Sequence, residues 1–286
     1  MSVVVTGATG PFGRHVVEGL LAAGVTDVLA GGRRLERAAD LAERGARVVE
    51  LDYDRPETLA PALAGTDTVL LVSGSEVGRR VAQHGAVIDA ATAAGVRRIV
   101  YTSAPHADTT DLVLAPEHKA TEALLAASGL VTTVLRNNWY TENYVQQLRQ
   151  AAATGQIVGA VGTGRVASAT RADLAAGAVA VLTSDAYDGR VLELTGDTAW
   201  TYDELAAAAS QVLGRPVTYR DVTPDELRAA LAAAGLDEGT AGFVVALDRN
   251  IAAGALADAT DTLRTLLGRP TTPLVDGLAA AWAATA

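Results

Sequence analysis

The chain has 286 residues, of which 49% are hydrophobic and 20% charged, and its formal net charge is −10. Nucleic-acid backbones and anionic membranes repel such a chain, because binding to them needs clustered Lys and Arg, so we expect neither as a partner. There is no Cys, and the four His residues lack a paired ligand spacing such as HExxH, so thiolate chemistry is excluded and we expect no metal site.

The N-terminus shows no basic segment followed by a long apolar run, because Val3–Val5 is followed at once by Thr6 and Gly7. No apolar stretch approaches the roughly 20 residues that span a bilayer. We therefore expect a cytoplasmic protein.

Short apolar runs alternate with segments of helical period through the first half of the chain. This alternation is typical of a parallel sheet with helices on both faces, and near-continuous apolar runs such as 68–73 and 98–103 fit strands that are covered on both sides. The sequence predicts an α/β fold with a doubly wound parallel sheet of the Rossmann type. Its expected strands lie near 2–6, 27–31, 46–51, 67–72, 97–102 and 131–135.

The rhythm weakens after about residue 150. Segment 155–173 reads as irregular chain or short strands, followed by a helix to about 183 and a strand at 189–196. Segments 201–214 and 223–235 each begin with Thr and carry an early Glu, which is the start signal of a capped helix.

These elements predict two parts. The first is a Rossmann domain over 1–152, completed by a return helix and strand at about 170–195. The second is a smaller, mostly helical C-terminal lobe that contributes the substrate cleft, over 153–169 and 196–286.

Three glycines spaced three residues apart, Gly7, Gly10 and Gly13, fall where the first predicted strand becomes a helix. In this context a GxGxxG pattern binds a dinucleotide; the spacing here is GxxGxxG, but the roles of tight turn, close backbone approach and helix–sheet packing can be the same. Pro11 suits the first helical turn, and the free amides of a helix N-terminus attract a diphosphate. The alternative is a glycine-rich turn without a ligand.

The end of the second strand distinguishes NAD(H) from NADP(H), because an acidic residue there accepts a hydrogen bond from the ribose 2′-hydroxyl. Arg33 and Arg34 occupy this place, and a guanidinium suits a 2′-phosphate. The sequence favours NADPH as the cofactor of the Rossmann domain over 1–152, with a solvated arginine pair beside Glu36 as the alternative. Asp52 and Tyr53 end the third strand and are placed to flank the adenine.

Segments along nearly the whole chain resemble, in order, those of atypical short-chain dehydrogenases/reductases of the NmrA-like class. The nearest pattern is that of the type 2 NAD(P)H:quinone oxidoreductases. The segments that carry this resemblance include TGATGPFG (6–13), LDYDRPETL (51–59), EHKATEALLAASGL (117–130), TVLRNNWYTENY (133–144), ASATRAD (167–173) and LTGDTAWTYDELA (194–206).

The resemblance implies an NADPH-binding Rossmann domain, a small lobe that closes a cleft, and two-electron reduction of quinones. By position, it implies that the adenosine diphosphate half is bound by Gly7, Thr9, Gly10, Phe12, Gly13, Arg33, Asp52 and Tyr53. It places Ser73, Gly74 and Ser75 beneath the ribose and nicotinamide, and Ser103, Arg136, Asn137 and Asn138 near the nicotinamide. The residues implied to face the substrate are His106, Trp139, Tyr140 and Tyr144.

The proton-transfer residues of the classical enzymes of this superfamily are missing. Those enzymes use a Tyr and a Lys four residues apart on a helix, where this chain has Leu114 and His118. Lys119 is one residue away and would point about 100° round the helix. A pair between His118 and Glu122 would explain this His without chemistry. Our candidate catalytic residues are Ser103, His118 and Asn137.

The missing acid favours a quinone as substrate, because a quinone that accepts hydride becomes a delocalised, weakly basic hydroquinone anion. It needs positioning more than acid catalysis, within about 3–3.5 Å of the nicotinamide C4. Trp139, Tyr140 and Tyr144 are three of only twelve aromatic residues and offer a stacking surface after a strand. The sequence predicts an NADPH-dependent quinone reductase that works by direct stacking, whereas the alternative role of these aromatic residues is packing.

Two other functions stay open. One is a reductase of a polycyclic quinone or aryl ketone in the tailoring of aromatic polyketides. The other is a non-catalytic, NADP(H)-sensing regulator, which the missing Tyr–Lys pair also permits. We expect a small-molecule quinone or aromatic carbonyl as substrate, and a monomer or homodimer.

Overall fold

The computed structural model describes residues 1–285, and the chain divides into two compact units. The first unit comprises Met1–Asp108, Leu114–Asn137 and Arg171–Leu194. The second comprises Thr109–Val113, Asn138–Thr170 and Thr195–Ala286. No helix within residues 1–285 combines the length and the apolar character needed to cross a membrane.

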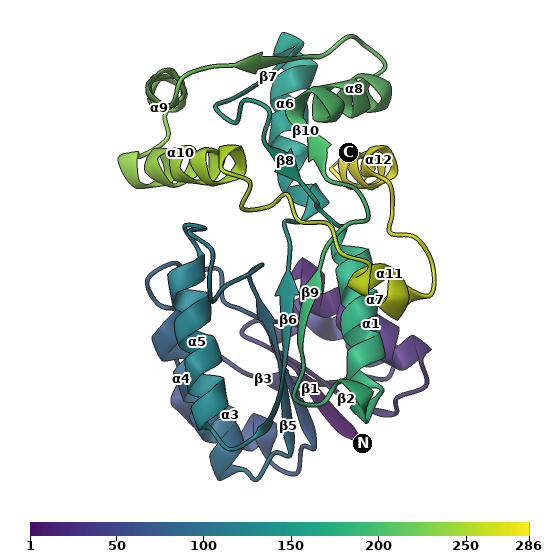
Figure 1. The fold of residues 1–286 in the computed structure, drawn as a ribbon. Helices are drawn as coiled ribbons and strands as arrows, with labels where there is room; N and C mark the ends of the chain where they lie inside the picture. The colour runs from purple at the N-terminus through teal and green to yellow at the C-terminus, as the bar shows by residue number, and fades with distance from the viewer. Residues whose placement is uncertain (286) are drawn as a thin grey trace. The chain divides into compact units, whose positions relative to one another are not determined.

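The first unit is built on a seven-stranded parallel sheet of order β3-β2-β1-β4-β5-β6-β9 (Figure 1). Its strands are β1 (Ser2–Val5), β2 (Asp27–Gly32), β3 (Arg47–Glu50), β4 (Thr68–Leu71), β5 (Arg98–Ser103), β6 (Val131–Asn137) and β9 (Val191–Leu194). The strand order reverses between the adjacent strands β1 and β4, and open α/β sheets bind ligands at the carboxyl ends of the strands at such a point. The predicted doubly wound fold is confirmed.

Helices cover both faces of this sheet, which explains why β1, β4 and β5 are buried along their whole length. Leu59, Val87 and Leu125 come from three of these helices and pack in one core with Val69 and Ile99 of the sheet. The helices on that face are α3 (Pro56–Leu63), α4 (Arg80–Ala93) and α5 (Ala115–Ala127), and those on the other face are α1 (Pro11–Ala22) and α7 (Arg171–Leu182). The shorter elements are η1 (Leu35–Ala38), α2 (Ala39–Glu43) and η3 (Asp185–Tyr187).

The second unit is mostly helical, as predicted. Its helices are η2 (Thr141–Tyr144), α6 (Val145–Thr154), α8 (Tyr202–Leu213), α9 (Pro224–Ala233), α10 (Glu238–Ala252), α11 (Thr262–Leu267) and α12 (Leu274–Ala283). Two strand pairs accompany them: β7 (Gln156–Gly159) runs parallel to β11 (Thr218–Asp221), and β8 (Arg165–Val166) runs antiparallel to β10 (Trp200–Thr201).

The two predicted helix starts in this unit are confirmed by complete capping boxes. Thr201 accepts from the backbone N–H of Glu204, whose carboxylate accepts from the N–H of Thr201. Thr223 and Glu226 repeat the arrangement at the start of α9. The local sequence therefore determines both boundaries, because each box satisfies amides that the helix itself leaves free.

Candidate functional site

The glycine loop (Gly7–Gly13) follows β1 and includes the first turn of α1, and its last glycine has no space for a Cβ. Gly7 has φ +60°, a left-handed conformation that favours glycine, and its carbonyl oxygen accepts from Gly10 N–H at 2.9 Å. A Cβ on Gly13 would lie 2.5 Å from this same oxygen. The helix that begins at Pro11 therefore starts directly against the strand end, as binding a diphosphate at its N-terminus requires.

Arg33 follows β2 beside the glycine loop. A Cβ on its neighbour Gly32 would lie 2.7 Å from Thr9 Cγ2, so the strand end and the loop are in contact. The Arg33 side chain is 57% exposed, and its Nη1 lies 3.2 Å from Glu76 Oε1. An exposed guanidinium can exchange this carboxylate for a phosphate at small cost, because surface ion pairs stabilise a protein little.

Tyr53 connects the end of β4 to the end of β1. Its hydroxyl donates to the Val72 carbonyl at 2.7 Å and is hydrogen-bonded to Thr6. Burial raises the pKa of Tyr53. The carboxylate of Asp52 accepts from Asp54 N–H at 3.1 Å. The contact of Asp52 and Tyr53 with an adenine stays a prediction.

Arg136, at the end of β6, lies in a cluster of three carboxylates. Its guanidinium donates to Glu122 at 2.7 Å, to Asp108 at 2.8 Å and to Glu193 at 3.1 Å. Burial alone would lower the pKa of Arg136, but its carboxylate partners raise it instead. Ser103 Oγ donates to Glu122 Oε1 at 2.6 Å. These bonds position Ser103 and Arg136 at the strand ends, whereas their contact with a cofactor stays a prediction.

Asn137 is the last residue of β6 and is only 6% exposed. Among residues 1–285, neither its amide nitrogen nor its amide oxygen has a hydrogen-bond partner. A buried, unpaired polar group costs about 1–3 kcal/mol. A carboxamide, which the nicotinamide ring carries, offers the matching donor and acceptor, so the side chain fits a place near that ring. The catalytic role of Asn137 stays a prediction.

His118 does not fit the catalytic role predicted for it. The side chain is buried, and its Nδ1 lies 2.7 Å from the Tyr101 hydroxyl. Desolvation, followed by the charges of Arg80 and His84, lowers the pKa of His118 to about 3, so the ring is neutral in the core near neutral pH. The alternative partner, Glu122, bonds to Ser103 and Arg136 instead. His118 and Glu122 do not pair because His118 lies on the face of α5 that packs against β5, where it meets Tyr101.

His106 follows β5 in a strained conformation. Its φ of +48° is the one positive value among the non-glycine residues that the structure describes. The backbone N–H donates to Glu193 at 3.2 Å, and the ring Nδ1 lies 3.4 Å from Glu193 Oε1. The side chain is 37% exposed, so it can meet a ligand, and its substrate contact stays a prediction.

The aromatic residues predicted to face the substrate belong to the second unit and differ in exposure. Trp139 and Tyr140 are half-buried. Tyr144 is 1% exposed, and its ring packs edge-on against Trp200 and Tyr202, with centroid distances of 4.9 and 6.0 Å. Tyr144 is therefore a core residue, and the predicted substrate contact is wrong for it.

Asn138, predicted to bind the cofactor, instead ties backbone segments of the second unit together. Its amide nitrogen donates to the Leu256 carbonyl at 3.3 Å, and its amide oxygen accepts from Trp139 N–H at 2.6 Å. The side chain is buried. Its amide is used at both ends, so this geometry does not support a cofactor contact.

Asp248 is a buried acid in the same unit, and its Oδ2 accepts from Ala160 N–H at 2.7 Å. Desolvation raises the pKa of Asp248 to about 6, so its ionised form disfavours folding once the pH rises through that value. Relative to wild type, we expect Asp248→Asn to raise the free energy of unfolding at pH 8 by about 2–3 kcal/mol more than at pH 4. Urea denaturation at both pH values measures this difference, and equal shifts at the two would contradict it.

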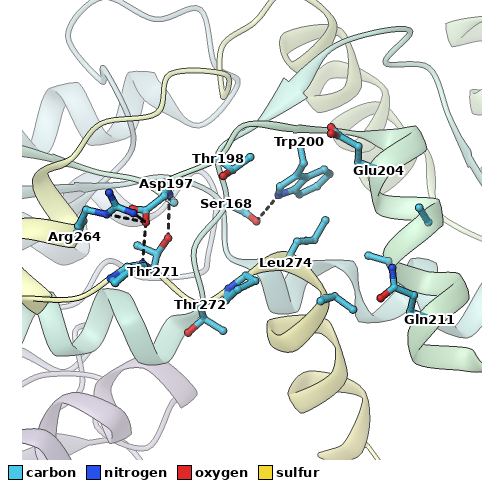
Figure 2. A pocket seen from close by; sticks show the side chains of 16 residues that line it. Ser168, Asp197, Thr198, Trp200, Glu204, Gln211, Arg264, Thr271, Thr272 and Leu274 are labelled. Carbon is cyan, nitrogen blue, oxygen red and sulfur yellow. Dashed lines mark hydrogen bonds and ion pairs between the residues drawn. The ribbon is translucent and has the colours of Figure 1, made fainter.

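A cavity of about 540 Å³ lies within the second unit, between β10, α8 and residues 270–275 (Figure 2). The indole N–H of Trp200 donates to Ser168 Oγ at 3.0 Å, and Arg264 pairs with Asp197 at 3.0 Å. Glu204 also lines the cavity, so its walls carry two carboxylates and one guanidinium. The described residues that line the cavity include none of the predicted substrate residues, and we assign it no part in a reaction.

Residues 1–285 contain no group of three or more His, Asp or Glu side chains that could hold a metal ion. Sequence reasoning missed Asp108 and Glu193 around Arg136, and it considered Glu122 only as a partner of His118. No local signal identifies them, because they come from a loop, a strand and a helix that meet only in the folded sheet.

Comparisons with known proteins agree with this geometry. Residues 7–185 match a family model described as NAD(P)H-binding. Quinone oxidoreductase 2 of Escherichia coli (strain K12) is 44% identical over 277 residues, which cover 96% of this chain and 97% of that protein. The crystal structure of the Escherichia coli NADPH-dependent quinone oxidoreductase complexed with NADPH has a TM-score of 0.92, with 97% and 99% of the two chains covered.

A more distant relative is an NmrA-like family domain-containing oxidoreductase of Aspergillus flavus. It is 30% identical over 234 residues, which cover 79% of this chain and 76% of that protein. Together with the nearer relatives, it confirms the resemblance predicted from the sequence.

Proposed function

The chain belongs to the NAD(P)H-binding protein family, and on that basis we propose that it is an NADPH-dependent quinone reductase. The observation that supports NADPH as the cofactor is the geometry of the glycine loop. Its backbone lies so close to the start of α1 that Gly13 has no space for a Cβ. The quinone as acceptor is supported by the relative that is 44% identical over almost the full length of both chains and is named for that activity.

In this proposal the residues of the first unit hold NADPH, which supplies a hydride when bound. The glycine loop and the N-terminus of α1 bind the diphosphate, and Arg33 binds the 2′-phosphate. The buried amide of Asn137 pairs with the carboxamide and sets the orientation of the ring. Trp139 and Tyr140 are the aromatic residues proposed to contact the quinone.

Consumption of NADPH with a graded panel of quinones and aryl ketones, followed by near-ultraviolet absorbance, tests the function. We expect turnover with simple benzoquinones and naphthoquinones, and a higher KM for the quinone in Trp139→Ala. Turnover with an anthraquinone alone would favour polyketide tailoring. Tight NADPH binding without any turnover, and with equal affinity for NADP⁺, would favour the sensor and overturn the proposal.

Arg33→Gln is expected to raise the Kd of NADPH about tenfold to hundredfold while leaving that of NADH unchanged. The physical reason is the loss of a charge-assisted hydrogen bond to the 2′-phosphate, worth about 1.5–3 kcal/mol. Arg44→Gln is the matched control, because Arg44 is similarly exposed and also paired, with Glu18 at 2.6 Å. Fluorescence titration with both cofactors measures the change, and equal losses for NADPH and NADH would count against this role of Arg33.

A further inference from the structure

The chain that follows β4 is held through its backbone by side chains from three neighbouring segments. Three successive amides each donate to a different side chain at 2.8–3.0 Å: Val72 to Thr6, Ser73 to Thr102, and Gly74 to His84. Connecting loops commonly leave their amides to water. Here all three amides donate to protein side chains, so each has a partner within the fold.

The peptide groups of Gly74 are held on both sides by one helix. Its N–H donates to His84 Nε2 at 3.0 Å, and its carbonyl accepts from Arg80 Nε at 2.6 Å. Arg80 and His84 are four residues apart on α4 and therefore share a face of the helix. A Cβ on Gly74 would lie 2.9 Å from Gln83 Oε1, so the loop backbone lies directly against α4.

Helix α5 braces both of these side chains. Arg80, only 8% exposed, has its Nη1 3.3 Å from Glu117 Oε2. His84 Nδ1 lies 2.9 Å from Thr121 Oγ1, which itself donates to the Glu117 carbonyl. Because the amide of Gly74 can only donate, the network assigns the lone pair of His84 to Nε2 and its proton to Nδ1.

The protonation state of His84, on which this hydrogen-bond network depends, does not change near neutral pH. Desolvation, and then the charge of Arg80, lowers the pKa of His84 to about 4, so the ring stays a neutral acceptor near neutral pH. A buried ion pair such as Arg80–Glu117 contributes little net stability. We therefore infer that the pair serves to hold the Arg80 side chain in position beside the Gly74 carbonyl.

We propose that Arg80 and His84 are positioning residues, which hold the Gly74 peptide where it meets the ribose and nicotinamide half of NADPH. The inference rests on the proposed function, because it takes Ser73–Ser75 as part of the cofactor site. The loop lies at the carboxyl end of β4, beside β1, where the strand order reverses. We call the two hydrogen bonds from Arg80 and His84 to the Gly74 peptide the clamp on Gly74. Because the glycine loop holds the diphosphate, loss of this clamp weakens only the binding of the nicotinamide half of NADPH.

Equilibrium titration of the full chain with NADPH and with adenosine 2′,5′-bisphosphate, which lacks the nicotinamide, tests the proposal. We expect His84→Leu to raise the Kd of NADPH about fivefold to tenfold and to leave that of the bisphosphate within about twofold. His84→Gln should restore NADPH binding, because its Oε1 can accept from Gly74 N–H in place of Nε2. A merely structural role would weaken both ligands alike.

Arg80→Met and Arg98→Met form a matched pair, because Arg98 is also buried and is ion-paired with Asp188 at 2.8 Å. Arg98 is the first residue of β5, at the amino end of the strand, whereas the proposed cofactor site lies at the carboxyl ends of the strands. Both variants should lose stability, but only Arg80→Met should selectively weaken NADPH. This pair decides the matter if His84→Leu does not fold. Equal rises for both ligands, or unchanged NADPH affinity in Arg80→Met, would overturn the inference. No quinone is present in these titrations, so a failure of quinone reduction leaves their result interpretable.

Discussion

Replacing Gly13 with Ala is expected to raise the Kd of NADPH about tenfold to hundredfold and to destabilise the fold by about 1–3 kcal/mol. The added Cβ would lie 2.5 Å from the Gly7 carbonyl oxygen, 2.8 Å from the Gly7 carbonyl carbon and 3.0 Å from Ala8 Cα. All three atoms belong to the backbone, so neither a rotamer change nor a flexible side chain can relieve the contact. The loop must move away from the helix, and its amides then lose their alignment with the diphosphate.

Gly19→Ala is the matched control, because it makes the same substitution in the same helix. Its Cβ would meet Val179 Cγ2 at 2.8 Å, the end of a side chain that can shift. We expect a loss of stability without a change in NADPH affinity, measured by urea denaturation and fluorescence titration. Comparable affinity in the two variants would show that the glycine loop does not depend on this close approach.

Replacing Arg136 with Met is expected to lower the free energy of unfolding by about 3–5 kcal/mol, the usual cost of removing one partner from a buried ion cluster. Glu122 and Glu193, whose side chains are 14% and 19% exposed, would then face each other without a cation. Repulsion and desolvation both act against their ionised forms. Urea denaturation at neutral pH measures the loss.

Two further variants test this explanation. Adding Glu122→Gln to Arg136→Met should recover part of the stability, because it removes one of the uncompensated charges. Arg97→Met, which breaks exposed pairs with Asp185 and Asp188, should cost less than about 1 kcal/mol. If the Arg136 and Arg97 variants lost similar amounts, the cluster would contribute no more than a surface ion pair.

The parts of the molecule that were predicted correctly are those whose signal is local. Alternating apolar runs predicted β1 to β6, and Thr201 and Thr223 predicted helix starts from the residue three positions further on. Each signal spans only a few residues, because strand and helix periods and capping bonds act between near neighbours in the chain.

The errors concern side chains whose partners lie far away in the chain. The four-residue spacing suggested that His118 pairs with Glu122, yet His118 bonds to Tyr101 and Glu122 bonds to Arg136. The aromatic ring of Tyr144 suggested stacking on a substrate, but this ring packs against Trp200 in the core of the second unit. The roles of the remaining candidate residues stay predictions.

The sequence by itself determined the class of fold and the place of the glycine loop, because each depends on a short run of residues. That Arg33 selects a phosphorylated cofactor stays a prediction from the same kind of local signal. Only the tertiary structure decided which buried side chains meet. The clamp on Gly74 brings together residues 74, 80, 84, 117 and 121 from a loop and two helices. Which buried side chains contact each other depends on how the helices pack against the sheet, and the spacing of residues along the chain does not predict these contacts.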